Sequence, residues 1–122
     1  MTTLNSNIKF FLELQSQLKV LHWQTKSHAK HLSFGETYHK LDELIDLFVE
    51  VSMGKYGRFK LENDDRVLNI NNLSDIDLVA MIKVACDVIC DIEIDKKDTD
   101  LLSLRDDILT QVSKLSYLLT LR

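Results

Sequence analysis

The chain of 122 residues contains no proline and only three glycines, Gly35, Gly54 and Gly57. Proline and glycine supply much of the turn chemistry that an all-β fold requires, so their scarcity argues against such a fold. It favours long uninterrupted helices, because these two residues are the poorest helix formers. We therefore expect an all-α fold, in one domain that covers residues 1–122, since a chain of this length supports a single hydrophobic core.

The sequence also lacks long apolar runs and an excess of basic residues, and it contains only two cysteines. No stretch is long and apolar enough to cross a bilayer, so we expect no membrane partner. The formal net charge of −4 makes DNA or other nucleic acid an unexpected partner. The two cysteines, Cys86 and Cys90, lie one helical turn apart, which is poor disulfide geometry within a helix. Unpaired cysteines are consistent with a reducing cytoplasm. We expect both to act as small apolar residues on a helix face.

Hydrophobic periodicity predicts four helices, and together they predict a four-helix bundle. The expected helices cover approximately residues 4–25, 33–55, 74–92 and 98–119. Ser33-Phe-Gly-Glu36 has the form of a capping box at the start of the second helix, and Ser74 is the expected cap of the third. Residues 54–73 break the periodicity, so we expect a connection that carries a short element or covers a surface.

All four histidines lie within eighteen residues of one another, at His22, His28, His31 and His39. Beside them, one stripe of the second predicted helix carries polar side chains opposite its apolar stripe, at Glu36, His39, Glu43, Asp46 and Glu50. A solvated face is the usual explanation for such a stripe. However, this stripe contains no lysine or arginine, and carboxylates with imidazoles are the ligands of Fe(II), Mn(II) or Zn(II).

Glu36-Thr-Tyr-His39 has the Glu-x-x-His form that is found in di-iron carboxylate bundles. A site inside one bundle would need a second such motif and further glutamates on the other helices. Beyond residue 73 the chain contains no histidine and one glutamate, Glu93. If metal binds to this protein, we therefore expect a second chain to complete the site.

The segment from Leu18 to His31, followed by an acidic helix, resembles the Dps-type mini-ferritins, in which a His-Trp pair ends the first helix. His22-Trp23 matches that pair, and His31 precedes Asp46 by the fifteen residues usual in the family. Asp46-Leu-Phe-Val-Glu50 matches the family's Asp-x-x-x-Glu motif. The interval from His22 to His31 is three residues shorter than in the family. Residues 18–58 also resemble compact ferritin-like proteins that tailed phages encode.

This resemblance implies a ferritin-like four-helix bundle with a dinuclear iron site at a two-fold subunit interface. It implies that His22 and His31 of one chain and Asp46 and Glu50 of its partner are the iron ligands and catalytic residues. The implied activity is that of a ferroxidase, which oxidises Fe(II) with hydrogen peroxide or dioxygen. The implied assembly is a hollow homo-oligomeric shell that stores the ferric product, most often with twelve subunits, in a bacterial or infected-host cytoplasm.

Several assignments stay open at the level of sequence. Glu36, His39 and Glu43 are further candidates, which would orient the ligands or steer iron, and Zn(II) or Mn(II) are candidate substitutes for iron. Trp23 is expected on the outer side of its helix, and His28 is expected to be a surface imidazole. The alternatives to a ferroxidase are a metal-binding module without redox activity and a purely structural helical bundle that binds other proteins.

Overall fold

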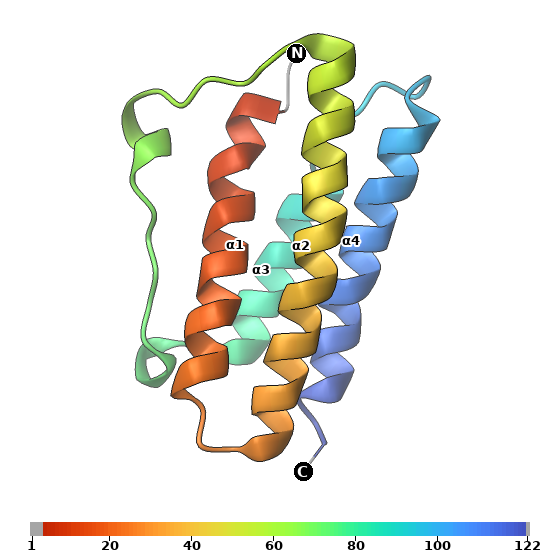
Figure 1. The fold of residues 1–122 in the computed structure, drawn as a ribbon. Helices are drawn as coiled ribbons and strands as arrows, with labels where there is room; N and C mark the ends of the chain where they lie inside the picture. Colours follow the sequence, from red (N-terminus) through yellow and green to blue (C-terminus); the bar gives the residue numbers. More distant parts are fainter. Residues whose placement is uncertain (1–3, 122) are drawn as a thin grey trace.

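The computed structural model describes residues 4–121, which form four long helices joined by two short connections and one long one (Figure 1). The helices are α1 (Leu4–Gln24), α2 (His28–Tyr56), α3 (Leu78–Cys90) and α4 (Thr99–Leu118). Two 3-10 turns, η1 (Asn63–Arg66) and η2 (Leu73–Asp75), lie in the long connection. The predicted all-α four-helix bundle is confirmed. Within residues 4–121, no helix has the length and hydropathy needed to cross a membrane.

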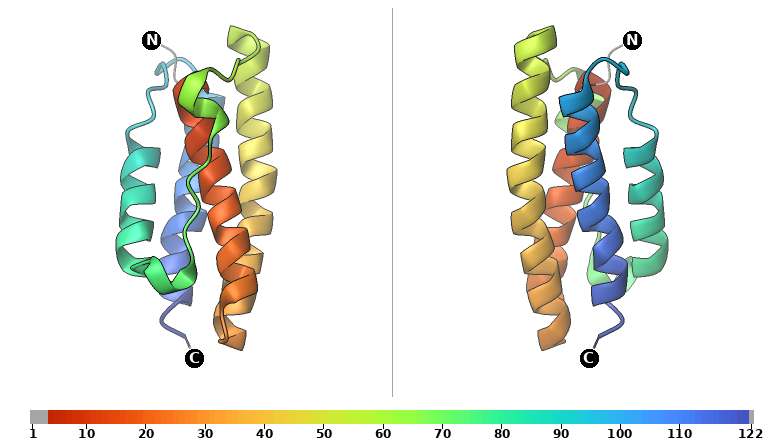
Figure 2. Two further views of the ribbon diagram at one scale, coloured as in Figure 1. Left: turned by 90° about the vertical axis from the view of Figure 1, so that its left-hand side faces the viewer. Right: turned by 90° about the vertical axis from the view of Figure 1, so that its right-hand side faces the viewer.

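The order of the helices in space follows from that one long connection. α1 packs against α2, α2 against α4, and α4 against α3. The connection between α2 and α3 runs the length of the bundle, so that α3 points in the same direction as α2, whereas α1 and α4 run the opposite way (Figures 1 and 2). The fold is therefore a bundle with a single long crossover rather than a simple up-down-up-down arrangement.

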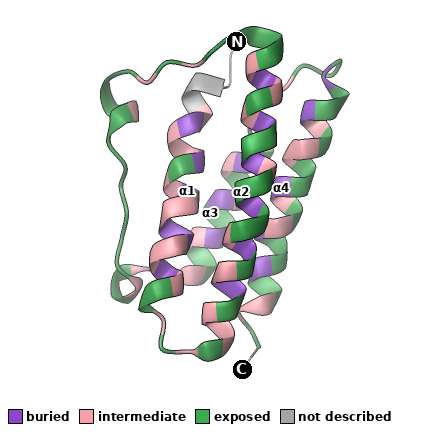
Figure 3. Cartoon of the chain, viewed as in Figure 1, coloured by how far each residue is buried: buried purple, intermediate pink, exposed green. Residues whose placement is uncertain are grey.

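The core is built from the apolar stripes that the periodicity predicts, and buried positions recur on the inner side of each helix (Figure 3). Within the core, Phe11 of α1 meets Phe48 of α2 edge to face, with ring centroids 5.6 Å apart. On α2, Leu41 and Ile45 are buried, whereas Leu44 is half-buried. The outward side of α2 is thereby left to its polar stripe.

The predicted start of the second helix is wrong by five residues. α2 begins at His28, and the side chain of Ser27 caps it by accepting a hydrogen bond from the backbone N–H of Lys30 at 3.2 Å. Ser33 lies inside the helix, where its hydroxyl donates to the carbonyl of Ala29. The capping-box spacing was misleading because serine and glutamate three residues apart also fit a helix interior.

The predicted cap of the third helix is also wrong. Ser74 lies within η2, and the helix begins only at Leu78. Asp77 is its N-cap, accepting hydrogen bonds from the backbone N–H groups of Val79 and Ala80. Aspartate and serine are about equally good as helix N-caps, so the residue type does not choose between them. Because Ser74 belongs to η2, Asp77 is the residue that caps α3. The fourth helix begins at Thr99, within the predicted range.

Residues 67–73, here called the strap, lie along α1 as the predicted surface-covering connection. The backbone N–H groups of Asn69, Asn71 and Leu73 donate to side chains of α1, at distances between 2.7 and 2.8 Å. Their acceptors are Glu13, Gln17 and Gln24, respectively. Gln17 also donates to the carbonyl of Asn71 at 2.9 Å, and its side chain is buried. Alternate backbone amides of the strap are thus fixed to one side of α1.

Replacing Gln17 with leucine is expected to destabilise the protein by about 1–3 kcal/mol, because it removes the two hydrogen bonds that the buried Gln17 amide makes with the backbone of Asn71. The free energy of unfolding in urea measures the effect. Gln24→Leu is the matched control, since Gln24 also bonds the strap but is exposed, and water can replace it. Equal losses for both variants would contradict a special role for the buried amide.

A cluster of polar side chains around Asp98, the N-cap of α4, lies where α2 ends and α4 begins. Tyr56 donates a hydrogen bond to the Asp98 carboxylate, and Lys55 forms ion pairs with Asp98 at 3.2 Å and with Asp100 at 3.0 Å. The hydrogen bond from Tyr56, followed by that from Lys55, holds the pKa of Asp98 below its ordinary value. These contacts join the end of α2 to the start of α4.

Candidate metal centre

His22, near the end of α1, and His31, in the first turns of α2, form a reciprocal pair. Nδ1 of His22 lies 2.7 Å from the carbonyl oxygen of His31, and Nδ1 of His31 lies 2.8 Å from the carbonyl oxygen of His22. The two imidazole rings stack, with centroids 3.8 Å apart and planes 17° from parallel. A carbonyl oxygen only accepts, so each Nδ1 carries a hydrogen and donates it.

The reciprocal bonds fix the tautomer of both imidazoles. In a neutral imidazole with hydrogen on Nδ1, Nε2 carries the free lone pair. Within the described part of the chain, neither Nε2 atom receives a hydrogen bond, and both rings are only half-buried. Metal-binding histidines characteristically donate the other ring N–H to a carbonyl or carboxylate in this way. The pair therefore presents two oriented nitrogen ligands.

The turn between α1 and α2 places the two histidines side by side. It consists of residues 25–27, and the backbone N–H of Ser27 donates to the hydroxyl of Thr25 at 3.2 Å. The carbonyl of Ser27 in turn accepts the backbone N–H of His31 at 2.9 Å. Because this connection is so short, the last turn of α1 and the first turns of α2 lie against each other.

The predicted acid pair, Asp46 and Glu50, lies on the outward side of α2, and both side chains are exposed. Together with Asp42 they line a groove of about 450 Å³ between α1 and α2, whose apolar wall includes Leu12 and Met53. The remaining residues of the predicted stripe are exposed too, at Glu36, His39 and Glu43. The expectation that the stripe points away from the core of its own chain is confirmed.

The histidine pair and the acid pair do not meet within one chain. His31 and Asp46 are fifteen residues apart on the same helix, which corresponds to about 22 Å along its axis. Among the residues that the structure describes, no three histidine, cysteine or acidic side chains converge on one point. A metal ion bound by both pairs would therefore require a second chain.

A basic side chain and the carboxylates lie at different levels of this outer surface of α1 and α2. Lys19 of α1 contacts Tyr38 of α2, whereas the groove farther along is lined by carboxylates. The ammonium group of Lys19 lies 4.7 Å from the ring centroid of Tyr38 and 5.5 Å from that of Trp23. Trp23 is 67% exposed, as predicted for the outer side of its helix. The contact between Lys19 and Tyr38 joins residues that are far apart in the sequence, so it depends on how α1 and α2 pack.

The secondary candidates are placed less favourably. Glu36 forms an ion pair with Lys114 of α4 at 3.7 Å, so it is directed toward α4 rather than toward the groove. His39 packs edge-on against Tyr38 with ring centroids 5.6 Å apart, and His28 is exposed as predicted. These positions leave Glu36 with a structural partner and give His28 no part in the pair.

The cysteines of α3 lie away from both pairs. Cys86 is half-buried against the core, with its sulfur 3.8 Å from the hydroxyl of Ser113, and Cys90 is exposed. Both are free thiols.

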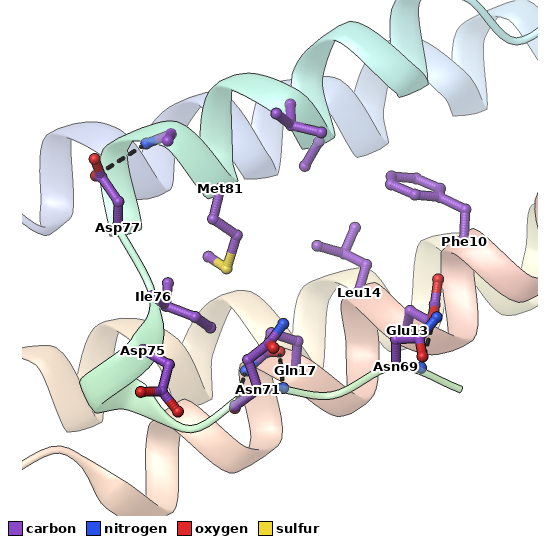
Figure 4. A pocket seen from close by; sticks show the side chains of 13 residues that line it. Phe10, Glu13, Leu14, Gln17, Asn69, Asn71, Asp75, Ile76, Asp77 and Met81 are labelled. Atoms are coloured by element: carbon purple, nitrogen blue, oxygen red, sulfur yellow. Dashed lines mark hydrogen bonds between the residues drawn. The ribbon is translucent and has the colours of Figure 1, made fainter. Parts of the chain in front are cut away.

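A second cavity, of about 460 Å³, lies between α1 and α3 beside the strap (Figure 4). Its wall includes the apolar side chains of Phe10, Leu14 and Met81. Two of its carboxylates, Glu13 and Asp77, already accept hydrogen bonds from backbone amides. Among the described residues, no imidazole or thiol lines this cavity, so its chemistry is less suited to a transition metal than that of the histidine pair.

Comparison with known proteins adds a family but no activity. The sequence model of DUF5856, described as a family of unknown function, matches residues 22–119, which begin at the first histidine of the pair. No curated protein and no solved structure matches the chain.

Proposed function

The chain belongs to DUF5856, a family of unknown function, and we propose that it is a Dps-like ferroxidase and iron-storage protein. In this proposal two chains pair through the outer surface of α1 and α2. His22 and His31 of one chain then bind Fe(II) together with Asp46 and Glu50 of the other. The observation that carries the proposal is the reciprocal histidine pair, which orients two half-buried imidazole rings through their Nδ1 atoms.

A two-fold axis accounts for the separation of the two ligand pairs. In such an interface a surface meets itself, and a two-fold axis perpendicular to α2 would place the histidine end of one chain against the acid end of its partner. Two equivalent sites would form, separated by about the same 22 Å that divides the pairs on α2. Lys19 would lie near the partner's carboxylates, and Trp23 would be covered. The single long crossover of the bundle is the connection that ferritin-like folds use.

The four side chains would divide the chemistry of iron oxidation between them. The carboxylate oxygens of Asp46 and Glu50 favour the higher charge of the Fe(III) product, whereas neutral imidazoles hold Fe(II) without adding negative charge. Hydrogen peroxide accepts one electron from each of two Fe(II) ions, and its O–O bond breaks to give two hydroxide ions. Dioxygen is the other candidate oxidant. Glu43, exposed on the same stripe, would attract iron toward the site.

An anaerobic titration with Fe(II), followed by peroxide, tests the proposal. We expect saturable binding by the wild-type protein and then a rapid rise in ferric absorbance. His31→Ala should abolish both, because it removes one ligand together with the hydrogen bond that its Nδ1 donates to the carbonyl of His22. His28→Ala is the matched control, since His28 lies one turn away on α2 and is exposed, and it should behave as wild type.

Other outcomes would select one of the alternatives. Tight binding of Fe(II), Zn(II) or Mn(II) without consumption of peroxide or dioxygen would indicate a metal-binding module without redox activity. Binding no stronger than that of the His31→Ala variant would leave a structural bundle, in which the histidine pair only fastens α1 to α2.

A further inference from the structure

Gly35 lies in the interior of α2, one turn beyond His31, directly against the ring of His22. A Cβ atom built on Gly35 would lie 2.8 Å from Cε1 and 2.9 Å from Nδ1 of His22. Separations below 3.0 Å essentially never occur for real Cβ atoms, so a side chain here would require the ring to move. The imidazole of His22 thus occupies the space that the side chain of residue 35 would otherwise fill.

The backbone gives no other reason for glycine at this position. The positive φ angle among the described glycines belongs to Gly57. Gly35 lies within α2 and adopts a helical conformation that any residue accepts. Glycine in a helix interior costs about 0.5–1 kcal/mol relative to alanine. Gly54, in the same helix, has nothing within 4 Å of the position that a Cβ atom would take, and therefore lacks this steric constraint. Close approach of the His22 ring is what distinguishes Gly35.

We propose that Gly35 is a positioning residue of the candidate metal centre. Its missing side chain lets the His22 ring lie flat on His31 while Nδ1 reaches the His31 carbonyl. The metal-binding part of this role rests on the proposed function, whereas the steric coupling between Gly35 and His22 does not.

A methyl group at position 35 would act through His22. The displaced ring would lose its hydrogen bond to the His31 carbonyl, and with it the constraint that keeps hydrogen on Nδ1. Loss of such orienting contacts typically weakens metal binding by about 10- to 100-fold. Gly35→Ala should therefore weaken metal binding although it removes no ligand.

A double-mutant cycle separates this coupling from helix propensity. Gly35→Ala is expected to lower Tm in the wild-type background but to raise it when His22→Ala has emptied the space. Gly54→Ala is the control, and it should raise Tm or leave it unchanged in both backgrounds. If Gly35→Ala fails to fold alone, recovery of the folded protein in the His22→Ala/Gly35→Ala variant gives the same answer.

Spectroscopy and metal titration give measurements that would not change if Gly35 had only a structural role. Nitrogen-15 spectra of the wild-type imidazoles should show hydrogen on Nδ1 of His22, and Gly35→Ala should lose that signature. Co(II), used as a spectroscopic probe of the metal-free protein, should bind Gly35→Ala at least about tenfold more weakly than Gly54→Ala.

The outcomes distinguish the two proposals. A change in Tm of the same sign and size in both backgrounds would overturn the coupling of Gly35 to His22. Coupling in the cycle with unchanged Co(II) affinity would overturn the role of Gly35 in the metal centre. If the wild-type protein binds no metal, the proposed function fails, and the cycle with the nitrogen-15 spectra still decides whether Gly35 positions the ring.

Discussion

Two variants that are each inactive should regain about a quarter of the wild-type rate of Fe(II) oxidation when their chains are refolded together in equal amounts. One variant is His22→Ala/His31→Ala, and the other is Asp46→Ala/Glu50→Ala. Each alone should fall to the rate of Fe(II) in buffer, because every site lacks one half of its ligands. In a mixed dimer, one of the two sites takes histidines from one chain and carboxylates from the other, and is intact.

The expected fraction follows from random pairing. About half of the dimers are mixed, and about half of the sites in them are complete. As a control for impurities, the same two variants are mixed without being unfolded. Activity should then return only as fast as chains exchange between dimers. Recovery is expected because about 22 Å along α2 separates the two ligand pairs of one chain. Absence of recovery from correctly folded mixed dimers would contradict a site shared between chains.

Phe48→Ala is expected to destabilise the protein by about 3–5 kcal/mol, the largest stability effect that we predict for a single substitution. Phe48 is 2% exposed and meets Phe11 edge to face in the core. Its removal leaves a cavity between α1 and α2 that the neighbouring side chains cannot fill without leaving their own contacts. The free energy of unfolding in urea, at fixed protein concentration, measures the loss.

Leu47→Ala is the matched control, one residue earlier on the same helix. Leu47 is 47% exposed, so its truncation should cost no more than about 1 kcal/mol. Losses of similar size in the two variants would contradict the assignment of the core face of α2. Folded Phe48→Ala protein should still bind Fe(II), because Asp46 and Glu50 lie on the opposite side of the helix from Phe48.

The candidate site was only partly predictable from the sequence. Local spacing placed Asp46 and Glu50 on one face of a helix and showed that this face lies opposite Leu41 and Ile45, because helical periodicity is a property of the chain itself. The reciprocal bonds between His22 and His31 depend on how two helices meet. The same holds for the ion pair of Glu36 with Lys114, whose partners are far apart in the sequence.

By itself, the sequence determined the number of helices, the residues that form the core and the outward direction of the acidic stripe. These features follow from the absence of proline and from apolar spacing, both of which act over a few neighbouring residues. Only the tertiary structure decided that Ser27 and Asp77 cap their helices and that the strap lies on α1. It also decided that a side chain at position 35 would meet the ring of His22, which lies on a different helix.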